Sequence, residues 1–237
     1  MKSNSRISLV VTASLTVLGG ASAPALADNA SAAPVPTSGA EWFRAGRSAV
    51  EANKLVNREL NTRRAKNVIL FVGDGMGVST VTAARILDGQ QRGVDGEWNR
   101  LSFEKFSDLA LSVTASANQQ TSDSAPTATA MVAGIKTNDG AISVDQSITR
   151  KEFCAEATRA KSVKTIMERA EERGMSTGVV STARITHATP AVNYAHISNR
   201  DWEANNTVDS DPGANAVPAG CTKVKDIAAQ LVDFKIG

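Results

Sequence analysis

The sequence has little net charge, which limits the kinds of partner that it can bind. Its 237 residues include 26 lysine and arginine residues and 24 aspartate and glutamate residues. Removal of residues 1–27 as a signal peptide would take away Lys2 and Arg6 and make the two counts equal. A formally neutral protein has no general electrostatic attraction to nucleic acid or to an anionic membrane. We therefore expect neither as a partner.

Long apolar runs are absent after Ala27, so no later segment is expected to cross a bilayer. The early run, residues 7–20, is short for a membrane span, follows two basic residues and precedes an A-x-A cleavage pattern that ends at Ala27. This order predicts a secretory signal peptide, residues 1–27, rather than an N-terminal membrane anchor. Export to a periplasm or to the medium follows. Residues 28–38, rich in alanine, serine and proline, then form a flexible lead-in.

Cysteine is scarce, with only Cys154 and Cys221 present. In an exported protein, the oxidising compartment favours one disulfide between them. This disulfide would close the segment that contains both histidines, His187 and His196. The alternative is a pair of free buried thiols.

Strand-like and helix-like segments alternate along the chain. Residues 67–72 lack polar alternation, as strands covered on both faces do. Residues 110–114 and 177–181 predict further strands. Capping signals, small residues and apolar periodicity predict helices around them. The predicted helical segments are residues 38–52, 79–87, 124–133, 163–170 and 224–231.

This alternation is typical of an α/β fold with a mostly parallel central sheet and helices on both faces. We expect a single domain over residues 39–237, with a long loop at residues 205–220. The chain ends where the next strand is expected, so the predicted sheet is incomplete at the C-terminus.

Asp74 stands alone among glycines at the end of the first predicted strand. Gly73, Gly75 and Gly77 allow a tight turn and leave space beside the carboxylate. The spacing is GxGxG rather than GxGxxG, and no GxxxxGK[ST] loop follows. Ligands of open α/β sheets bind beyond the carboxyl ends of strands, and a carboxylate there favours a cation over a phosphate. The alternative is an Asp that only stabilises the turn.

Ser124 opens a helix of small residues. A serine at that point is most often an N-cap. The free amides and positive dipole end of a helix also favour a bound anion. A serine oxygen held there could attack phosphorus if its pKa were lowered. Since neither His nor Lys adjoins it in sequence, a metal ion is the expected activator.

Thr189 and Arg200 follow the last predicted strand, residues 177–181. Thr189 offers a hard oxygen of the kind that Mg²⁺ prefers. Arg200 offers a planar fork of donors suited to phosphate oxygens. Taken alone, each has a common structural use, Thr189 in a turn and Arg200 in a surface ion pair.

Together, these stretches resemble one family, the alkaline phosphatases. The matching segments are residues 67–87, 121–134 and 181–200, and the resemblance runs in order from about Trp42 to the C-terminus. Its most specific parts are Asp74-Gly75-Met76-Gly77 and Asp123-Ser124-Ala125.

The resemblance implies hydrolysis of phosphate monoesters with two zinc ions and one magnesium ion. It makes Ser124 the nucleophile, which would also contact a metal, and Arg200 the phosphate clamp oriented by Asp123. Asp74 would bridge one Zn²⁺ and the Mg²⁺, and Thr189 would bind the Mg²⁺. Water would then hydrolyse the phosphoserine and release inorganic phosphate.

Further family properties follow from the same resemblance. His187 stands where members carry His or Asp near the third metal, whereas His196 is interpreted as structural. Cys154 and Cys221 match cysteines that are paired in some members. The family is commonly dimeric, so a homodimer is expected for a full-length protein.

The resemblance also identifies missing ligands. Zinc sites normally need three or four protein ligands, and neither histidine matches a zinc-binding position. In the family, the other zinc ligands and a magnesium-binding Glu lie beyond the point that corresponds to Gly237. The chain is therefore expected to be the N-terminal portion of a phosphatase. The alternatives are an inactive exported phosphate-binding protein and a related sulfatase or phosphodiesterase, although the Asp123-Ser124-Ala125 context disfavours a sulfatase.

Overall fold

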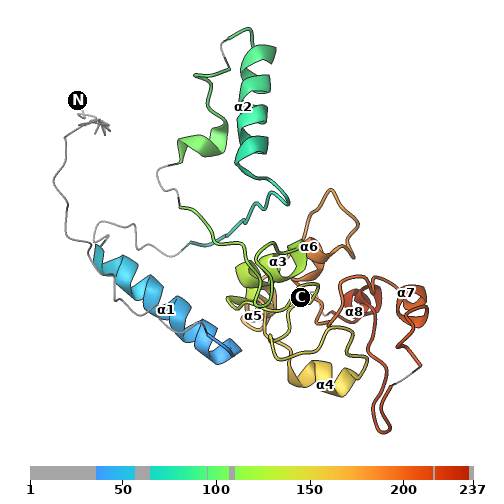
Figure 1. Ribbon diagram of the computed structural model, residues 1–237. Helices are drawn as coiled ribbons and strands as arrows, with labels where there is room; N and C mark the ends of the chain where they lie inside the picture. The colour runs from blue at the N-terminus through green and yellow to red at the C-terminus, as the bar shows by residue number, and fades with distance from the viewer. Residues whose placement is uncertain (1–35, 57–64, 95, 107–109, 216, 235–237) are drawn as a thin grey trace, which may run out of the picture. The chain divides into compact units, whose positions relative to one another are not determined.

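The computed structural model describes residues 36–56, 65–94, 96–106, 110–215 and 217–234. They all belong to one contact unit, Pro36–Gly237. The predicted signal peptide and nearly all of the predicted lead-in lie outside the described residues. Helices form the regular structure that is described (Figure 1). They are α1 (Gly39–Val56), α2 (Val78–Gln91), the 3₁₀ helix η1 (Ser102–Lys105), α3 (Ser124–Ala133), α4 (Ala155–Ala160), α5 (Ile166–Glu171), α6 (Ala188–Ala191), α7 (Asn205–Asp209) and α8 (Ile227–Asp233).

The predicted helices at residues 38–52, 79–87 and 124–133 are confirmed as α1, α2 and α3. The α1 capping signal is half realised: Ser38 Oγ accepts from the Glu41 amide at 3.3 Å, but the Glu41 carboxylate accepts from the Thr37 amide instead of that of Ser38. At the end of α3, Gly134 has φ +72°, as expected for a glycine that closes a helix.

The last two predicted helices are also present, with shifted bounds. The helix predicted at residues 163–170 is the shorter α5, because Thr165 and Glu168 form a capping box that starts it later. The helix predicted at residues 224–231 is α8, which begins after the cap residue Asp226.

The prediction of a continuous loop over residues 205–220 is wrong, because α7 lies within it. The short helices α4 and α6 were not predicted either. Each has six residues or fewer, too few to show a helical period in the sequence. Packing stabilises them: Ala188 and Ala191 of α6, for example, are buried.

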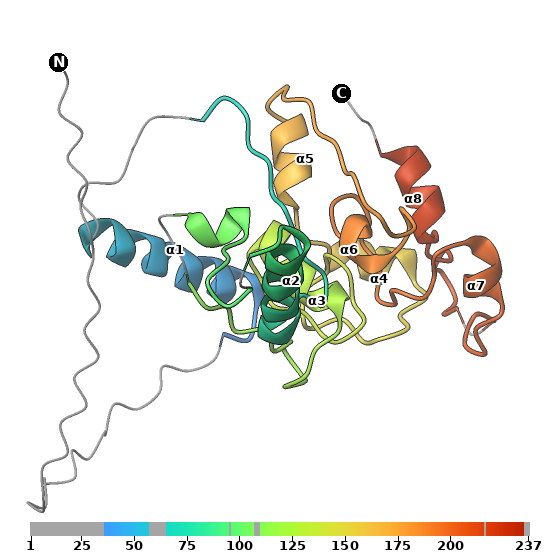
Figure 2. The same cartoon turned by 90° about the horizontal axis from the view of Figure 1, so that it is seen from above.

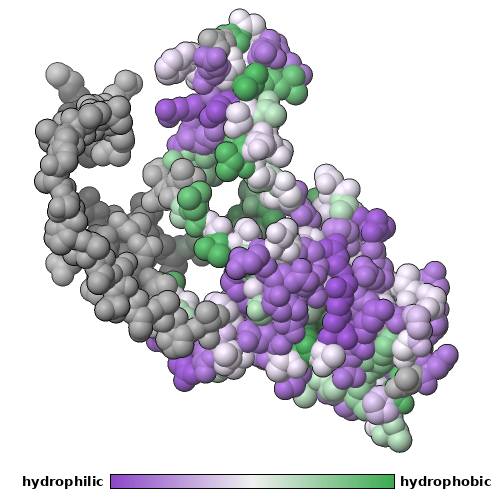
Figure 3. All heavy atoms as spheres, viewed as in Figure 1, coloured by the Kyte–Doolittle hydropathy of each residue, from purple (hydrophilic) through white to green (hydrophobic). Residues whose placement is uncertain are grey.

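The predicted central sheet is not confirmed. Within the part of the chain that the structure describes, residues 67–72, 110–114 and 177–181 form no strands. Pairing there is limited to isolated bridges, such as that between Ile142 and Ile197. A strand needs a neighbour for its amides and carbonyls. The burial expected for these segments is also absent, since Phe71 is 88% and Leu111 96% exposed. Figure 3 shows hydrophobic residues at the surface.

The hydrophobic core lies between residues 125 and 227. The helix α3 contributes Ala125 and Ala128 and packs against α6 and α5 (Figures 1 and 2). In the same cluster, the rings of Phe153 and Trp202 lie 4.4 Å apart. The start of α3 and the α6 region are therefore held by a common core.

Among the described residues, no helix is both long and apolar enough to span a membrane.

The predicted disulfide between Cys154 and Cys221 is present. Flanking hydrogen bonds fix the two segments that it joins: the Ala155 amide donates to the Thr222 carbonyl, and the Val224 amide to the Phe153 carbonyl, both at 2.9 Å. The crosslink closes a sequence separation of 67 residues.

We expect loss of this crosslink to lower the free energy of unfolding by about 4 kcal/mol, because a loop of this length greatly restricts the unfolded chain. Urea unfolding of the oxidised protein is compared with that of the Cys154→Ser/Cys221→Ser variant, each with and without reductant. Reductant should shift only the oxidised protein. Equal urea midpoints for the unsubstituted protein and the variant, both without reductant, would contradict the expectation.

His196 is held on both sides of its ring, in keeping with the structural role expected for it. Nδ1 lies 2.7 Å from the Ser143 carbonyl and Nε2 2.9 Å from the Glu168 carboxylate. Both neighbours accept hydrogen bonds, so the protonated ring fits best. Burial alone would lower the pKa of His196, but the hydrogen bond and charge of Glu168 raise it. Burial would likewise raise the pKa of Glu168, yet His196 keeps that pKa lowered.

This pair predicts a stability window in pH. The contribution of His196 to the free energy of unfolding is complete below pH 6.5, the ordinary pKa of histidine, and is lost as pH rises through the raised pKa of the folded state. The contribution of Glu168 to the free energy of unfolding is complete above pH 4.5, the ordinary pKa of glutamate, and is lost as pH falls through the lowered pKa of the folded state. We expect Glu168→Gln to destabilise the fold most between these values, by about 1–3 kcal/mol.

Chemical unfolding across pH measures this effect. Glu172→Gln is the matched control, because Glu172 follows the same helix and its ion pair with Lys164 is exposed. If the loss of unfolding free energy in Glu168→Gln does not vary with pH, the charged pair between Glu168 and His196 is contradicted.

Candidate active site

The first turn of α3 presents Ser124 with its hydroxyl free of a capping role. The N-cap is Asp123, whose Oδ1 accepts from the Ala125 amide at 2.5 Å. The alternative of Ser124 as N-cap is therefore wrong, because the residue before it takes that role. Ser124 is the first helical residue and is half-buried. Its oxygen lies at the end of the helix where the amides and the dipole favour negative charge.

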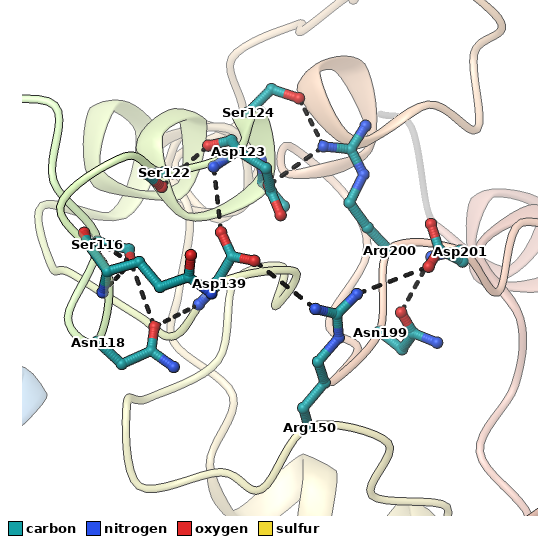
Figure 4. A network of polar contacts seen from close by, with 12 residues as sticks. Ser116, Asn118, Ser122, Asp123, Ser124, Asp139, Arg150, Asn199, Arg200 and Asp201 are labelled. Carbon is teal, nitrogen blue, oxygen red and sulfur yellow. Dashed lines mark hydrogen bonds and ion pairs between the residues drawn. The ribbon is translucent and has the colours of Figure 1, made fainter.

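The Arg200 guanidinium lies directly against this serine (Figure 4). Nη1 donates to Ser124 Oγ at 2.7 Å and to Asp123 Oδ1 at 3.1 Å. The Arg200 side chain is only 18% exposed. Its backbone amide donates to the Gly140 carbonyl at 2.8 Å, which fixes where the side chain starts. The predicted nucleophile, clamp and orienting carboxylate are thus brought together.

His187 contacts the other arm of the clamp. Its Nε2 lies 2.9 Å from Arg200 Nη2. Since a guanidinium only donates hydrogen bonds, Nε2 accepts, and the proton of the neutral ring is on Nδ1. That Nδ1 is buried and has no hydrogen-bond partner among the residues that the structure describes. In this arrangement His187 helps to hold Arg200, and its predicted place near a metal stays a prediction.

The loop that leads to His187 is fixed by residues that the sequence did not identify. Glu203 accepts from Arg184 Nε at 3.0 Å and Nη2 at 2.7 Å, and from Thr186 Oγ1 at 2.6 Å. Tyr194 Oη donates to the Ile185 carbonyl at 2.6 Å. The Arg184 hydrogen bonds lower the pKa of Glu203 to about 2, so the carboxylate is charged at neutral pH.

Asp74 and Thr189 form a second part of the site. Thr189 Oγ1 donates to Asp74 Oδ2 at 2.6 Å, although 115 residues separate them in sequence. Asp74 lies in the expected glycine turn: Gly75 has φ +67°, and a Cβ at Gly73 would approach Met76 within 2.8 Å. Thr189 belongs to α6, the helix that begins directly after His187, so α6 connects the two parts of the site.

The two oxygen donors fit a magnesium ion. Mg²⁺ binds proteins through one or two carboxylates and keeps several waters, and Asp74 and Thr189 supply a carboxylate and a hydroxyl side by side. Zinc fits less well, because it needs at least three protein ligands. Over the described ranges, the one cluster of three close His, Cys, Asp or Glu residues is Cys154, Glu156 and Cys221. Its cysteines are disulfide-bonded, so the described residues do not form the two predicted zinc sites.

Comparison with solved structures shows the class of fold. The crystal structure of Thermus thermophilus alkaline phosphatase aligns with a TM-score of 0.50 and 22% identity, covering 77% of this chain and 31% of that chain. The fold is therefore alkaline-phosphatase-like, although the described residues do not form the central sheet that the sequence predicted.

Sequence comparison then gives the family. The profile of the family described as alkaline phosphatase matches residues 65–236, and the chain belongs to this family. It is 48% identical to the alkaline phosphatase of Gadus morhua over 174 residues, which are 73% of this chain and 35% of that protein. It is 47% identical to the tissue-nonspecific isozyme of Homo sapiens over 175 residues, 74% of this chain and 32% of that protein. The chain thus spans about a third of the length of these relatives.

Proposed function

We propose that this chain carries the nucleophile and the phosphate clamp of an exported phosphomonoesterase. One observation carries the proposal: Ser124 Oγ lies at the N-terminus of α3, 2.7 Å from Arg200 Nη1. A helix N-terminus and a partly buried arginine both favour a dianionic phosphate, and the serine oxygen beside them is placed to attack it. The family to which the chain belongs supports the same reaction.

The chemistry needs two displacements at phosphorus. The Ser124 hydroxyl loses its proton to solvent, Oγ forms a bond to phosphorus as the bond to the ester oxygen breaks, and the leaving alkoxide takes a proton from solvent. Water then attacks the phosphoserine, which returns the hydroxyl of Ser124 and releases inorganic phosphate. Each displacement inverts phosphorus, so the overall result is retention. In both steps Arg200 and the backbone amide of Ser124 would hold the equatorial oxygens, where negative charge concentrates.

The proximity of Arg200 also favours the reactive form of the serine. A positive charge 2.7 Å from a hydroxyl oxygen stabilises its deprotonated state. Asp123 keeps the guanidinium aimed at the serine through the 3.1 Å hydrogen bond. A magnesium ion bound by Asp74 and Thr189 would add positive charge to the site. The two zinc ions expected from the family belong to the same proposal.

A second candidate function is phosphate binding without turnover. The anion-binding groups Ser124 and Arg200 are in contact, whereas the described residues do not form a zinc site. A protein with this set of groups could hold phosphate without transferring it. Export, by the predicted signal peptide, and a homodimeric assembly belong to both proposals.

One experiment separates the two functions. The chain is incubated with p-nitrophenyl phosphate, Mg²⁺ and Zn²⁺ and quenched in acid, and the peptide that contains Ser124 is analysed by mass spectrometry. Binding of inorganic phosphate is measured in parallel by calorimetry. Release of p-nitrophenol with phosphate on Ser124 supports the phosphomonoesterase. Phosphate binding without modification supports the binding protein, and the absence of both contradicts the proposal.

A further inference from the structure

Arg150 lies between two carboxylates that each adjoin the candidate site (Figure 4). Its Nη1 is 3.6 Å from Asp139 Oδ2, and its Nη2 is 3.6 Å from Asp201 Oδ2. Asp139 uses its other oxygen, Oδ1, to accept from the Asp123 amide at 3.1 Å. Asp201 directly follows Arg200 in the chain. The Arg150 guanidinium thus connects Asp201, the residue after the clamp, with Asp139, which in turn binds the amide of the residue before the nucleophile.

The turn at residues 139–140 makes the same connection through the backbone. While Asp139 binds the Asp123 amide, the carbonyl of Gly140 accepts from the Arg200 amide at 2.8 Å. Gly140 has φ +76°, a conformation that L side chains rarely adopt. A Cβ at this position would also lie 2.8 Å from Cζ of Arg150. The absence of a side chain there lets the guanidinium lie close to the turn.

The turn has support on its far side as well. The Asp139 amide donates to Asn118 Oδ1 at 2.9 Å, and Ser116 Oγ donates to the same oxygen at 3.2 Å. Asp139 therefore has fixed partners on its backbone and on one carboxylate oxygen, which leaves the second oxygen to face Arg150. Its side chain is 15% exposed, whereas that of Asp201 is 70% exposed. Solvent screens the Asp201 contact more, so the Asp139 contact is the stronger of the two.

We propose that Arg150 is a positioning residue for phosphate binding. It acts through Asp139 and Asp201 and keeps the start of α3 in register with Arg200. This inference rests on the proposed function, because the register matters only if Ser124 and Arg200 share a phosphate. Arg150 also balances the two carboxylates beside a site for an anion, where their negative charge alone would oppose binding.

The test uses the whole chain and two measurements. Inorganic phosphate binding is measured by calorimetry, and hydrogen exchange of the Asp123 and Arg200 amides by NMR. Arg150→Gln removes both ion pairs, whereas Arg150→Lys keeps the charge without the fork. The matched control is Lys223→Gln, which removes a lysine from a surface ion pair with Asp209. Asp139→Asn keeps an acceptor for the Asp123 amide but lacks the charge that faces Arg150.

We expect Arg150→Gln to weaken phosphate binding about two- to fivefold, the range of partly exposed ion pairs, and to speed exchange at both amides. Arg150→Lys should give an intermediate result and Lys223→Gln no change in either measurement. Asp139→Asn should speed exchange at the Asp123 amide, and combining it with Arg150→Gln should add little to that effect, because both changes remove the ion pair between Arg150 and Asp139. Thermal unfolding of each variant shows whether global stability has changed.

Failure of this inference differs from failure of the proposed function. If the unsubstituted chain binds phosphate and Arg150→Gln matches Lys223→Gln in affinity and exchange, the positioning role is overturned while the phosphate site stands. If the unsubstituted chain binds no phosphate, the proposed function is overturned and the positioning role with it.

Discussion

Substitution of Ser124 by alanine is expected to abolish hydrolysis of phosphate monoesters, with a loss on the order of 10⁴-fold or more, as for other nucleophilic serines. The reason is local, because no other hydroxyl of the described residues contacts the Arg200 guanidinium. Phosphate binding should persist, since Arg200 and the backbone amide of residue 124 remain. Steady-state turnover of p-nitrophenyl phosphate, measured beside the phosphate affinity, separates these two effects.

Ser122→Ala is the matched control. Ser122 is two residues from the nucleophile in the sequence. Its hydroxyl donates to the Asp123 carbonyl at 3.1 Å rather than contacting the clamp. Helix stability should not confuse the comparison, because Asp123 rather than Ser124 caps α3. Near-normal turnover in Ser124→Ala, with turnover also retained in Ser122→Ala, would show that another group attacks phosphorus.

Substitution of Arg200 by alanine is expected to weaken inorganic phosphate binding by about 30-fold or more. The guanidinium is largely buried, and its removal leaves the Asp123 carboxylate without a cation beside an incoming anion. Both effects act against binding, so affinity should fall more than the rate of the chemical step. Competitive inhibition of turnover by phosphate measures the affinity, and calorimetry replaces it where turnover is absent.

Arg200→Lys tests the geometry of the clamp separately from its charge. A lysine cannot contact Ser124, Asp123 and His187 at once through a planar fork, so an intermediate affinity is expected. Arg173→Ala is the control for loss of an exposed arginine. An unchanged phosphate inhibition constant in Arg200→Ala would rule out the clamp role.

Local signals in the sequence predicted much of what the structure contains. A capping signal located α1, apolar spacing located α2, and small residues with a stop glycine located α3, because these signals act over a few turns. The resemblance to a family indicated that Ser124, Asp123 and Arg200 belong together. The N-cap suggested for Ser124 lies instead at Asp123, directly before it, because both residue types cap helices.

Contacts between distant parts of the chain were the features that the sequence could not provide. Glu203 holds Arg184 from 19 residues away, and Asp139 holds the Asp123 amide from 16 residues away. Neither acid lies in a motif of its own. The strand predictions were not confirmed for a related reason: an apolar run such as residues 67–72 becomes a strand only beside a second segment, and a local pattern does not specify which segment that is.

The bond between Thr189 and Asp74 has a consequence for the order of folding. It closes a loop of 115 residues, and the contact of Arg200 with Ser124 closes one of 76. Closing a long loop costs chain entropy before any contact compensates, so such contacts form late. The helix α3 can form early from its own sequence, with its serine already in place. We therefore expect the capacity to hold phosphate to arise late in folding, when the α6 segment docks.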